Sequence, residues 1–132
     1  MDRADLERAC AEVLNSFGYI DILINAAGGN SPQATTSANT SFFDLDIHAI
    51  DSVLGLNFTG TTLSCQVFGR NMAERTQGVI VNITSMNALR LLTRIPPYSA
   101  AKAAVANFTQ WLAVHMAQEY SPAIRVKTRS RI

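Results

Sequence analysis

The apolar positions of this chain alternate between helix-like and strand-like stretches. In Asp5–Phe17, apolar side chains recur every three or four residues, which predicts a helix with one buried face that Gly18 is placed to end. Asp21–Asn25 is a short run that is too apolar for a strand with one exposed face. Gly28–Asn39 is rich in Gly, Ser, Thr and Asn, and this composition predicts a loop.

The rest of the chain repeats this order of helix and strand. A second loop is closed by two prolines, which are suited to the first turn of a helix. The predicted elements are a turn at Phe42–Leu45, a long helix over Ile47–Glu74, a strand at Val79–Thr84, a loop at Asn87–Pro97, a helix over Tyr98–Glu119 and a short strand at Ala123–Lys127.

Strands that are separated by helices favour a parallel sheet in an α/β fold. Right-handed crossovers that step in one direction place their helices on the same face of the sheet. Side chains alternate along a strand, so Leu23 points away from Ile22 and Ile24, and Ile80 points away from Val79 and Val81. Both strands therefore place apolar side chains on both faces of the sheet. Because the helices cover only one face, we expect the other face to be left uncovered.

Composition and charge narrow the class of protein. The length of 132 residues allows one domain, and a hydrophobic content of 48% argues against wholesale disorder. A net charge of +1 gives no strong field for nucleic acid or a membrane surface, and the basic residues at 125–131 are expected to be solvated. Cys10 and Cys65 have no metal-ligand spacing and indicate reduced thiols in a cytoplasmic protein. No apolar run is long enough to span a membrane.

One pair of residues is suited to acid/base chemistry. Tyr98 and Lys102 are four residues apart, which places them on the same face of the predicted helix. A neighbouring cation favours the phenolate form of a tyrosine and makes it more useful as an acid or base near neutral pH. Taken alone, the spacing also fits a buried tyrosine and a surface lysine on an amphipathic helix.

Three further features surround this pair. An apolar run leads into Asn-Ala-Ala-Gly at residues 25–28, Asn57 lies within the long helix, and Ser85 precedes Tyr98 by thirteen residues, just after a strand. In this order and spacing, the four features resemble the short-chain dehydrogenase/reductase family. Asn57, Ser85, Tyr98 and Lys102 match its catalytic Asn-Ser-Tyr-Lys set.

The resemblance covers residues 21–126 and implies a fold and a reaction. It implies a partial, Rossmann-like, doubly wound parallel sheet, with strands like the family's fourth to sixth and three helices on one face. Residues 1–132 would form part of an NAD(P)-binding domain that acts on a small alcohol or ketone. The sequence at residues 28–30 and 87–97 most resembles that of family members that act on sugar acids such as mannonate or fructuronate. Family dimers commonly pack through helices equivalent to Ile47–Glu74 and Tyr98–Tyr120, which implies a homo-oligomer.

The resemblance also implies a role for each matched residue. Tyr98 would be the general acid or base, and Lys102 would activate it and hold the hydroxyls of the nicotinamide ribose. Ser85 would donate a hydrogen bond to the substrate oxygen, although capping the end of its strand is an alternative. Asn57 would keep a water molecule in a proton relay to Lys102, or it is simply a solvent-facing helix residue.

Three residues at the end of the first strand and just after it would contact the cofactor, NAD or NADP. Asn25, Ala26 and Gly28 would lie beside its ribose, because ligands of open α/β sheets bind beyond the carboxyl ends of the strands. Small or missing side chains would permit a close approach there. Asn25 could equally tie adjacent strands together.

The chain departs from the family pattern at both ends. It has no Gly-x-x-x-Gly-x-Gly turn for a cofactor pyrophosphate, and from Lys127 onward it lacks the family's Pro-Gly turn. A truncated or frame-shifted gene product would explain both departures. The alternative to an oxidoreductase is therefore a non-catalytic fragment whose long helices only mediate association.

Overall fold

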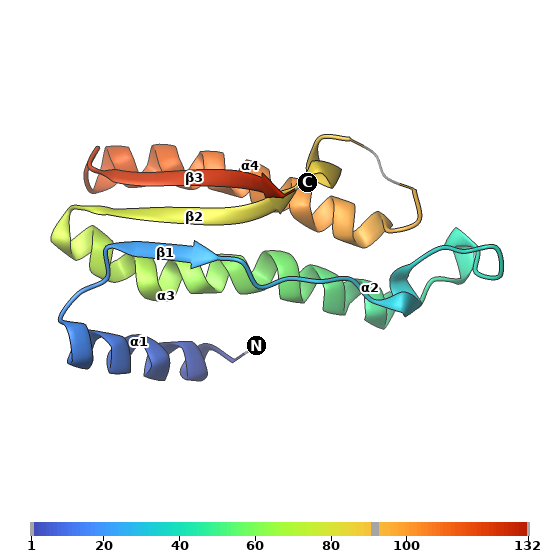
Figure 1. Ribbon diagram of the computed structural model, residues 1–132, viewed down its shortest axis with the longest axis horizontal. Helices are drawn as coiled ribbons and strands as arrows, with labels where there is room; N and C mark the ends of the chain where they lie inside the picture. The colour runs from blue at the N-terminus through green and yellow to red at the C-terminus, as the bar shows by residue number, and fades with distance from the viewer. Residues whose placement is uncertain (1, 91–92, 132) are drawn as a thin grey trace.

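Three parallel strands and the helices that connect them make up the architecture of the chain (Figure 1). The computed structural model describes residues 2–90 and 93–131. The helices are α1 (Arg3–Phe17), α2 (Ile47–Leu54), α3 (Gly60–Arg75) and α4 (Pro96–Glu119), and the strands are β1 (Ile22–Asn25), β2 (Gly78–Ser85) and β3 (Ile124–Arg131). Short 3-10 turns occupy η1 (Pro32–Ala34), η2 (Phe42–Asp44) and η4 (Met86–Ala88), and η3 (Gly55–Thr59) is a π-helical turn.

Strand β2 is the centre of the sheet, and its neighbours run parallel to it. It pairs with β1 in a register that places Ile22 beside Val79, and with β3 from Gly78 beside Ile124. The predicted parallel α/β architecture of a partial Rossmann-like sheet is confirmed. Strand β3 continues four residues past the predicted end at Lys127, because β2 offers it pairing partners along its whole length.

The ends of α1 follow the local sequence. The Asp2 side chain accepts a hydrogen bond of 3.0 Å from the Ala4 N–H and so caps the first turn. At the other end, Gly18 has a φ of 81°, and its N–H donates to the Leu14 carbonyl at 2.8 Å. This left-handed conformation suits glycine and ends the helix where the sequence predicts.

The long helix predicted over Ile47–Glu74 is interrupted by η3. Helices α2 and α3 flank this turn directly, so the helical run extends from Ile47 to Arg75. Within η3, the Asn57 amide donates to the Val53 carbonyl at 2.8 Å. Side chains that bond to the backbone compete with the regular helical ladder, and π-turns of this kind often occur at functional sites.

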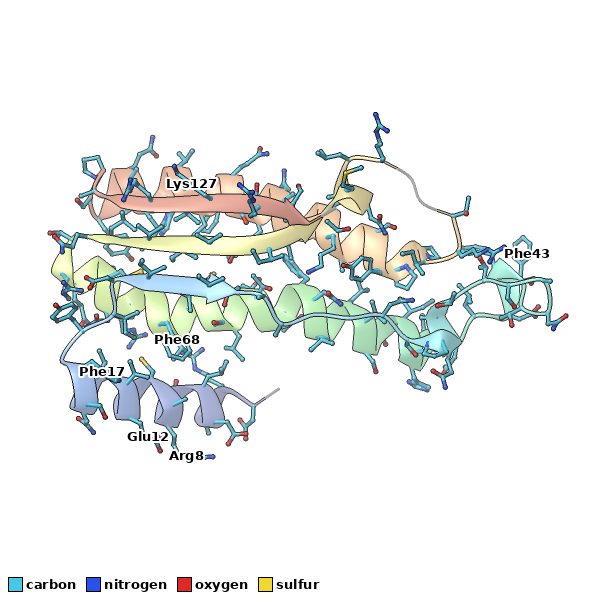
Figure 2. All side chains as sticks on the ribbon, in the orientation of Figure 1. Arg8, Glu12, Phe17, Phe43, Phe68 and Lys127 are labelled. Carbon is cyan, nitrogen blue, oxygen red and sulfur yellow. The ribbon has the colours of Figure 1, made fainter. Side chains whose placement is uncertain are left out.

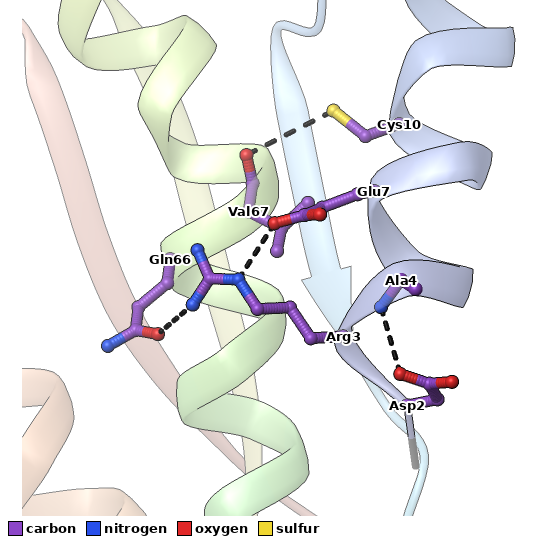
Figure 3. Close-up of polar contacts among 7 residues, drawn as sticks. All are labelled: Asp2, Arg3, Ala4, Glu7, Cys10, Gln66 and Val67. Carbon is purple, nitrogen blue, oxygen red and sulfur yellow. Dashed lines mark hydrogen bonds and ion pairs between the residues drawn. The ribbon is translucent and has the colours of Figure 1, made fainter.

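All the long helices pack on one side of the sheet. Helices α3 and α4 lie behind the strands in Figure 1, and α1 lies beside α3. In Figure 3, the Cys10 thiol of α1 points toward the Val67 carbonyl of α3 at 4.0 Å, and Arg3 reaches Gln66 at 3.4 Å. The main core lies between this helical layer and the sheet; its members include Met72, Ile80, Leu112, Met116, Ile124 and Val126.

The opposite face of the sheet is open among residues 2–90 and 93–131. Ile22 and Ile24 of β1 are each 61% exposed, whereas Ile80 on the covered face of β2 is fully buried. Val79 and Val81 lie beside the two isoleucines and are half-buried. The bare face expected from the alternation of side chains is therefore present in the described part of the chain.

Within the same described residues, no helix has the length and apolar character that a membrane span would require.

We expect the open face to make the isolated chain self-associate. Each exposed aliphatic side chain forgoes roughly 1.5–3 kcal/mol of burial, while a whole domain is stable by only about 5–15 kcal/mol. The chain should therefore bind a hydrophobic dye strongly and show no sharp monomeric melting transition. Sedimentation and dye fluorescence test this expectation. A monodisperse monomer that melts cooperatively above about 50 °C would contradict it.

Candidate active site

The matched residues gather where β1 and β2 end. Because the two strands are parallel, Asn25 and Ser85 finish at the same edge of the sheet. Helix α4 begins near this edge and contacts η4, which follows β2 directly. Its first turns carry Tyr98 and Lys102. The fold therefore brings elements from four separate parts of the sequence to one edge.

Lys102 is a buried lysine, with 5% of its surface exposed. Its Nζ donates to the Ile83 carbonyl of β2 at 3.1 Å and lies 5.6 Å from the centre of the Tyr98 ring. Burial lowers the pKa of the Lys102 ammonium from its usual value, because the charged form loses water. The alternative of a surface lysine is wrong, and the ammonium does face the tyrosine.

Tyr98 is half-buried, and the packing of its aromatic ring holds the side chain in place. The ring packs on a small cluster formed by Ala34, Ala49 and Val53, with Ile50 at its edge. No hydrogen bond among the described residues uses the Tyr98 hydroxyl. The helix and the cluster thus fix the ring and leave the phenol oxygen available to a ligand.

Ser85 ends β2 and caps the turn η4. Its Oγ accepts a hydrogen bond of 3.3 Å from the Asn87 N–H. This confirms the strand-end capping that the sequence left as an alternative. The serine is half-buried, and its O–H is not used by a hydrogen bond to any residue in 2–90 or 93–131. Capping and donation to a substrate are therefore compatible, because they use different sides of one hydroxyl.

Asn57 is fully buried at the π-turn η3. Its amide donates to the Gly29 carbonyl at 2.7 Å as well as to Val53, and its Oδ1 accepts from the Gly29 N–H at 3.3 Å. The alternative of a solvent-facing helix asparagine is wrong. The side chain instead clamps the loop that follows β1. A relay water at Asn57 stays a prediction.

Gly28 is packed against two of the matched side chains. A Cβ built on this glycine would lie 2.6 Å from the Asn57 Oδ1 and 3.1 Å from the Lys102 Nζ. The first of these separations is shorter than a real Cβ tolerates. The missing side chain therefore makes room for Asn57 and Lys102, in addition to the cofactor contact predicted from the sequence.

Asn25 belongs to a buried polar network. Its amide donates to the Asn82 Oδ1 of β2 at 2.8 Å and lies 3.3 Å from the Cys65 sulfur of α3. The Asn82 amide donates in turn to the Thr109 Oγ1 of α4 at 2.9 Å. These bonds support the strand-tying role that the sequence left open for Asn25, while a cofactor contact for this residue stays a prediction.

The network contains residues that sequence reasoning missed. Asn82 is fully buried and Thr109 is 2% exposed, and each stands in an otherwise apolar setting. Burial raises the pKa of the Cys65 thiol to about 11, so at neutral pH the group is a protonated, weakly polar member of the network. The only signal in the sequence was an asparagine inside an apolar strand.

Ala26 borders a small cavity beside this network. The cavity has a volume of about 140 Å³ and is lined by Leu6, Ile24, Asn25, Ala26, Ala27, Leu56, Gly60, Thr61 and Ser64. This volume is well below the roughly 300–1,000 Å³ of ordinary ligand pockets. Ala26 therefore lines only part of any surface that a dinucleotide would contact.

A family model described as short chain dehydrogenase matches residues 1–128. The chain belongs to the short chain dehydrogenase family. An uncharacterized oxidoreductase of Bacillus subtilis (strain 168) is 45% identical to it over 126 residues, which is 89% of this chain and 45% of that protein. The D-threitol dehydrogenase of Mycolicibacterium smegmatis is 34% identical over 129 residues, which is 98% of this chain and 46% of that enzyme.

A solved structure shows the same fold. The crystal structure of a Haemophilus influenzae protein, provisionally designated a D-mannonate oxidoreductase and solved with bound NAD, is 40% identical and superposes with a TM-score of 0.88. The match covers 98% of this chain and 49% of that one. The chain thus spans about half the length of the relatives it matches.

Proposed function

We propose that this chain carries the proton-transfer centre of an NAD(P)-dependent oxidoreductase that interconverts a secondary alcohol and a ketone. The observation that supports this most is the buried Lys102 ammonium, which lies 5.6 Å from the Tyr98 ring at the carboxyl edge of the sheet. A buried lysine that pairs with no carboxylate among residues 2–90 and 93–131 costs stability, so its presence at this position fits a chemical role. Membership of the short chain dehydrogenase family supports the same reaction class.

Three groups of this chain would act on the substrate oxygen. In alcohol oxidation, the Tyr98 oxygen takes the hydroxyl proton, and in ketone reduction it returns that proton. Ser85 donates a hydrogen bond to the same oxygen and fixes its position. The Lys102 ammonium favours the phenolate form of Tyr98. A bound nicotinamide cofactor would supply the hydride chemistry, with hydride leaving the alcohol carbon in oxidation and returning to the carbonyl carbon in reduction.

The residues present fit a nicotinamide cofactor at this edge. Lys102 has three N–H donors, and the Ile83 carbonyl takes one of them, which leaves donors for ribose hydroxyls. Ala26 and Gly28 offer little side chain where the cofactor would approach the loop after β1. Asn57 holds that loop in place through both polar groups of Gly29.

For the substrate, we propose a polyhydroxylated molecule such as a sugar acid. The provisional designation of the Haemophilus influenzae structure, a D-mannonate oxidoreductase, supports a sugar acid. The D-threitol dehydrogenase acts on a polyol, which is chemically close.

A chimaera tests the proposed function. Residues 1–128 replace the matched segment of the D-threitol dehydrogenase, and the oxidation of D-threitol is followed with NAD and with NADP. We expect activity with at least one cofactor, because the catalytic groups of this chain then work beside a complete cofactor site. A folded chimaera that binds either nucleotide but transfers no hydride would contradict the proposal. Screening D-mannonate and other sugar acids with the same protein tests the substrate class.

We also propose that the chain forms homo-oligomers through its two long helices. A groove of about 750 Å³ lies between α3 and α4, and Trp111 on its rim is 57% exposed. Trp111 stacks on His115 with ring centres 4.8 Å apart, so the rim is an ordered aromatic surface. This groove also favours the second candidate function, association without catalysis.

Trp111→Glu should shift the sedimentation of the chimaera toward the monomer if the groove is the interface.

Gly28→Ala is expected to destabilise the chimaera by about 1–3 kcal/mol, the usual cost of forcing an extra methyl group into a packed site. The new Cβ would meet Asn57 and Lys102. Urea unfolding measures the change. Gly29→Ala is the matched control, since its Cβ would make only an ordinary contact of 3.8 Å with Leu56. Equal effects of the two substitutions would show that Gly28 has no special packing role.

Lys102 is expected to make stability depend on pH in the alkaline range. Its pKa is lowered in the folded state from 10.5, so the unfolded chain binds more protons between the two values. Stability should therefore rise with pH through that window, relative to a Lys102→Met variant of the chimaera without cofactor. Urea unfolding at a series of pH values measures the difference. A fall over the same window would mean that the ammonium is stabilised, not penalised, by its surroundings.

A further inference from the structure

The hydroxyl of Thr109 is a buried polar group on the face of α4 that carries Tyr98 and Lys102. Lys102 follows Tyr98 by four residues and Thr109 follows Lys102 by seven, close to one and two turns, so the three side chains share one side of the helix. Thr109 is 2% exposed. Its Oγ1 accepts a hydrogen bond of 2.9 Å from the Asn82 amide and donates to the Val105 carbonyl at 2.7 Å. The hydroxyl is therefore occupied inside the protein, and burial keeps it from any ligand.

The Asn82 amide of β2 is held in one orientation. Its Oδ1 accepts from the Asn25 amide at 2.8 Å, so its N–H group is the end that faces α4. Asn82 is fully buried, and an amide N–H in such a place needs an acceptor. The Thr109 hydroxyl supplies that acceptor, whereas a valine of the same shape could not. The two bonds thus form a directed chain from the end of β1, through β2, to α4.

The bond between Asn82 and Thr109 lies behind the site on both elements. Helix α4 begins at the edge of the sheet where β2 ends and runs back behind β3, against the direction of the strands (Figure 2). Ser85 is three residues beyond Asn82, about 10 Å along the strand, and Lys102 is seven residues before Thr109, about 10 Å along the helix. A shift of α4 along β2 would therefore move Lys102 relative to Ser85, and the bond opposes such a shift.

Other contacts restrain this shift less well. Around Lys102, α4 presents mostly alanines, which are too small to interlock with the strands. Apolar burial has no preferred direction, whereas a hydrogen bond weakens steeply when its donor and acceptor move out of line. The Lys102 ammonium reaches the Ile83 carbonyl at 3.1 Å, but a long, flexible side chain can follow a moving helix. The short Thr109 side chain cannot, so its bond is the more sensitive to the position of α4.

We propose that Thr109 is a positioning residue for the acid/base reaction, an inference that rests on the proposed function. Through Asn82, it fixes where α4 lies along β2. The position of α4 in turn sets where the Tyr98 oxygen and the Lys102 ammonium lie relative to Ser85. A displacement of about 1 Å in an active site can cost about a hundredfold in rate, so a small shift of α4 is enough to lower turnover.

Thr109→Val in the chimaera tests the proposal, because it removes the acceptor and keeps the shape of the side chain. Turnover of D-threitol oxidation at saturating cofactor should fall at least about tenfold, while the KM for D-threitol stays unchanged, since Thr109 is buried away from both ligands. The pH at which turnover reaches half its maximum should rise, because a displaced Lys102 ammonium favours the phenolate of Tyr98 less. Thr109→Ser restores the hydroxyl and should recover the turnover and the pH profile.

Two further variants separate positioning from stability, with rates compared for equal folded amounts by circular dichroism. Thr62→Val makes the same exchange on α3, where the Thr62 hydroxyl has no hydrogen-bond partner among the described residues, and it should match the parent. The double variant Asn82→Leu with Thr109→Val replaces both partners by apolar groups of similar shape, which can restore stability lost in the single variant. It should stay as slow as Thr109→Val, because the directed bond is still absent, and it provides the test if the single variant does not fold.

Three outcomes would overturn the proposal and leave the proposed function intact. The first is a Thr109→Val variant with the turnover and pH profile of the parent. The second is a double variant that regains parental turnover, since the bond would then contribute stability alone. The third is an equal loss in Thr62→Val, which would trace the effect to the exchange and not to the bond with Asn82. A parent chimaera that binds nucleotide and transfers no hydride would instead overturn the proposed function, and this inference with it.

Discussion

Tyr98→Phe is expected to lower the turnover of the chimaera by about a hundredfold or more, the scale on which a general acid or base contributes. Phenylalanine keeps the ring that packs on Ala34, Ala49 and Val53, so the fold around it should be unchanged. The substitution removes only the hydroxyl, which makes no hydrogen bond to the described residues. Turnover and KM for D-threitol, measured at saturating cofactor, should show the loss in turnover.

A tyrosine on the same helix provides the control. Tyr120 lies at the far end of α4 and is 50% exposed, so Tyr120→Phe removes the same atom away from the sheet edge. Its turnover should equal that of the parent chimaera. A Tyr98→Phe variant that retains most of its activity would take Tyr98 out of the mechanism.

Local pattern predicted the elements and part of the site. The four-residue spacing of Tyr98 and Lys102 placed them on one helix face, and the structure brings the ammonium to the ring. The alternation along Asp21–Asn25 and Val79–Thr84, together with the one-sided crossovers, predicted that one apolar face of the sheet would be open. Such features depend on backbone geometry that repeats every few residues, so a single sequence contains them.

Contacts between distant segments could not be predicted in this way. The clamp between Asn57 and Gly29 joins residues 28 positions apart, and the bond between Asn25 and Asn82 joins residues 57 apart. Neither contact produces a periodic pattern of residues in the sequence. The π-turn at η3 was missed for the same reason, since the Gly29 carbonyl that binds the Asn57 amide comes from another element.

The extent of β3 shows how pairing overrides local composition. Residues 127–131 look like a basic, solvated tail, and short-range pattern gives no reason to extend the strand through them. Strand β2 nevertheless offers backbone partners as far as Ser85, and β3 follows it to Arg131. Hydrogen bonding between strands therefore orders a segment whose side chains alone would not predict a strand.

Asn82→Ala is expected to reduce the free energy of unfolding of the chimaera by about 2–4 kcal/mol. The substitution removes a donor to Thr109 and the acceptor of Asn25, and buried groups that lose a partner cost about 1–3 kcal/mol each. The empty volume left beside Cys65 adds a cavity cost. Urea unfolding of the parent and the variant, read from the shift in midpoint at constant slope, measures the difference.

Two further variants test whether the effect of Asn82→Ala comes from the buried polar network. Asn39→Ala deletes the same atoms at an exposed loop position and should change stability by less than about 0.5 kcal/mol. Because Asn25 and Asn82 share a hydrogen bond, the cost of Asn25→Ala combined with Asn82→Ala should be smaller than the sum of the single costs. Strict additivity would show that the two amides act independently, and the strand-tying role of Asn25 would then have to be abandoned.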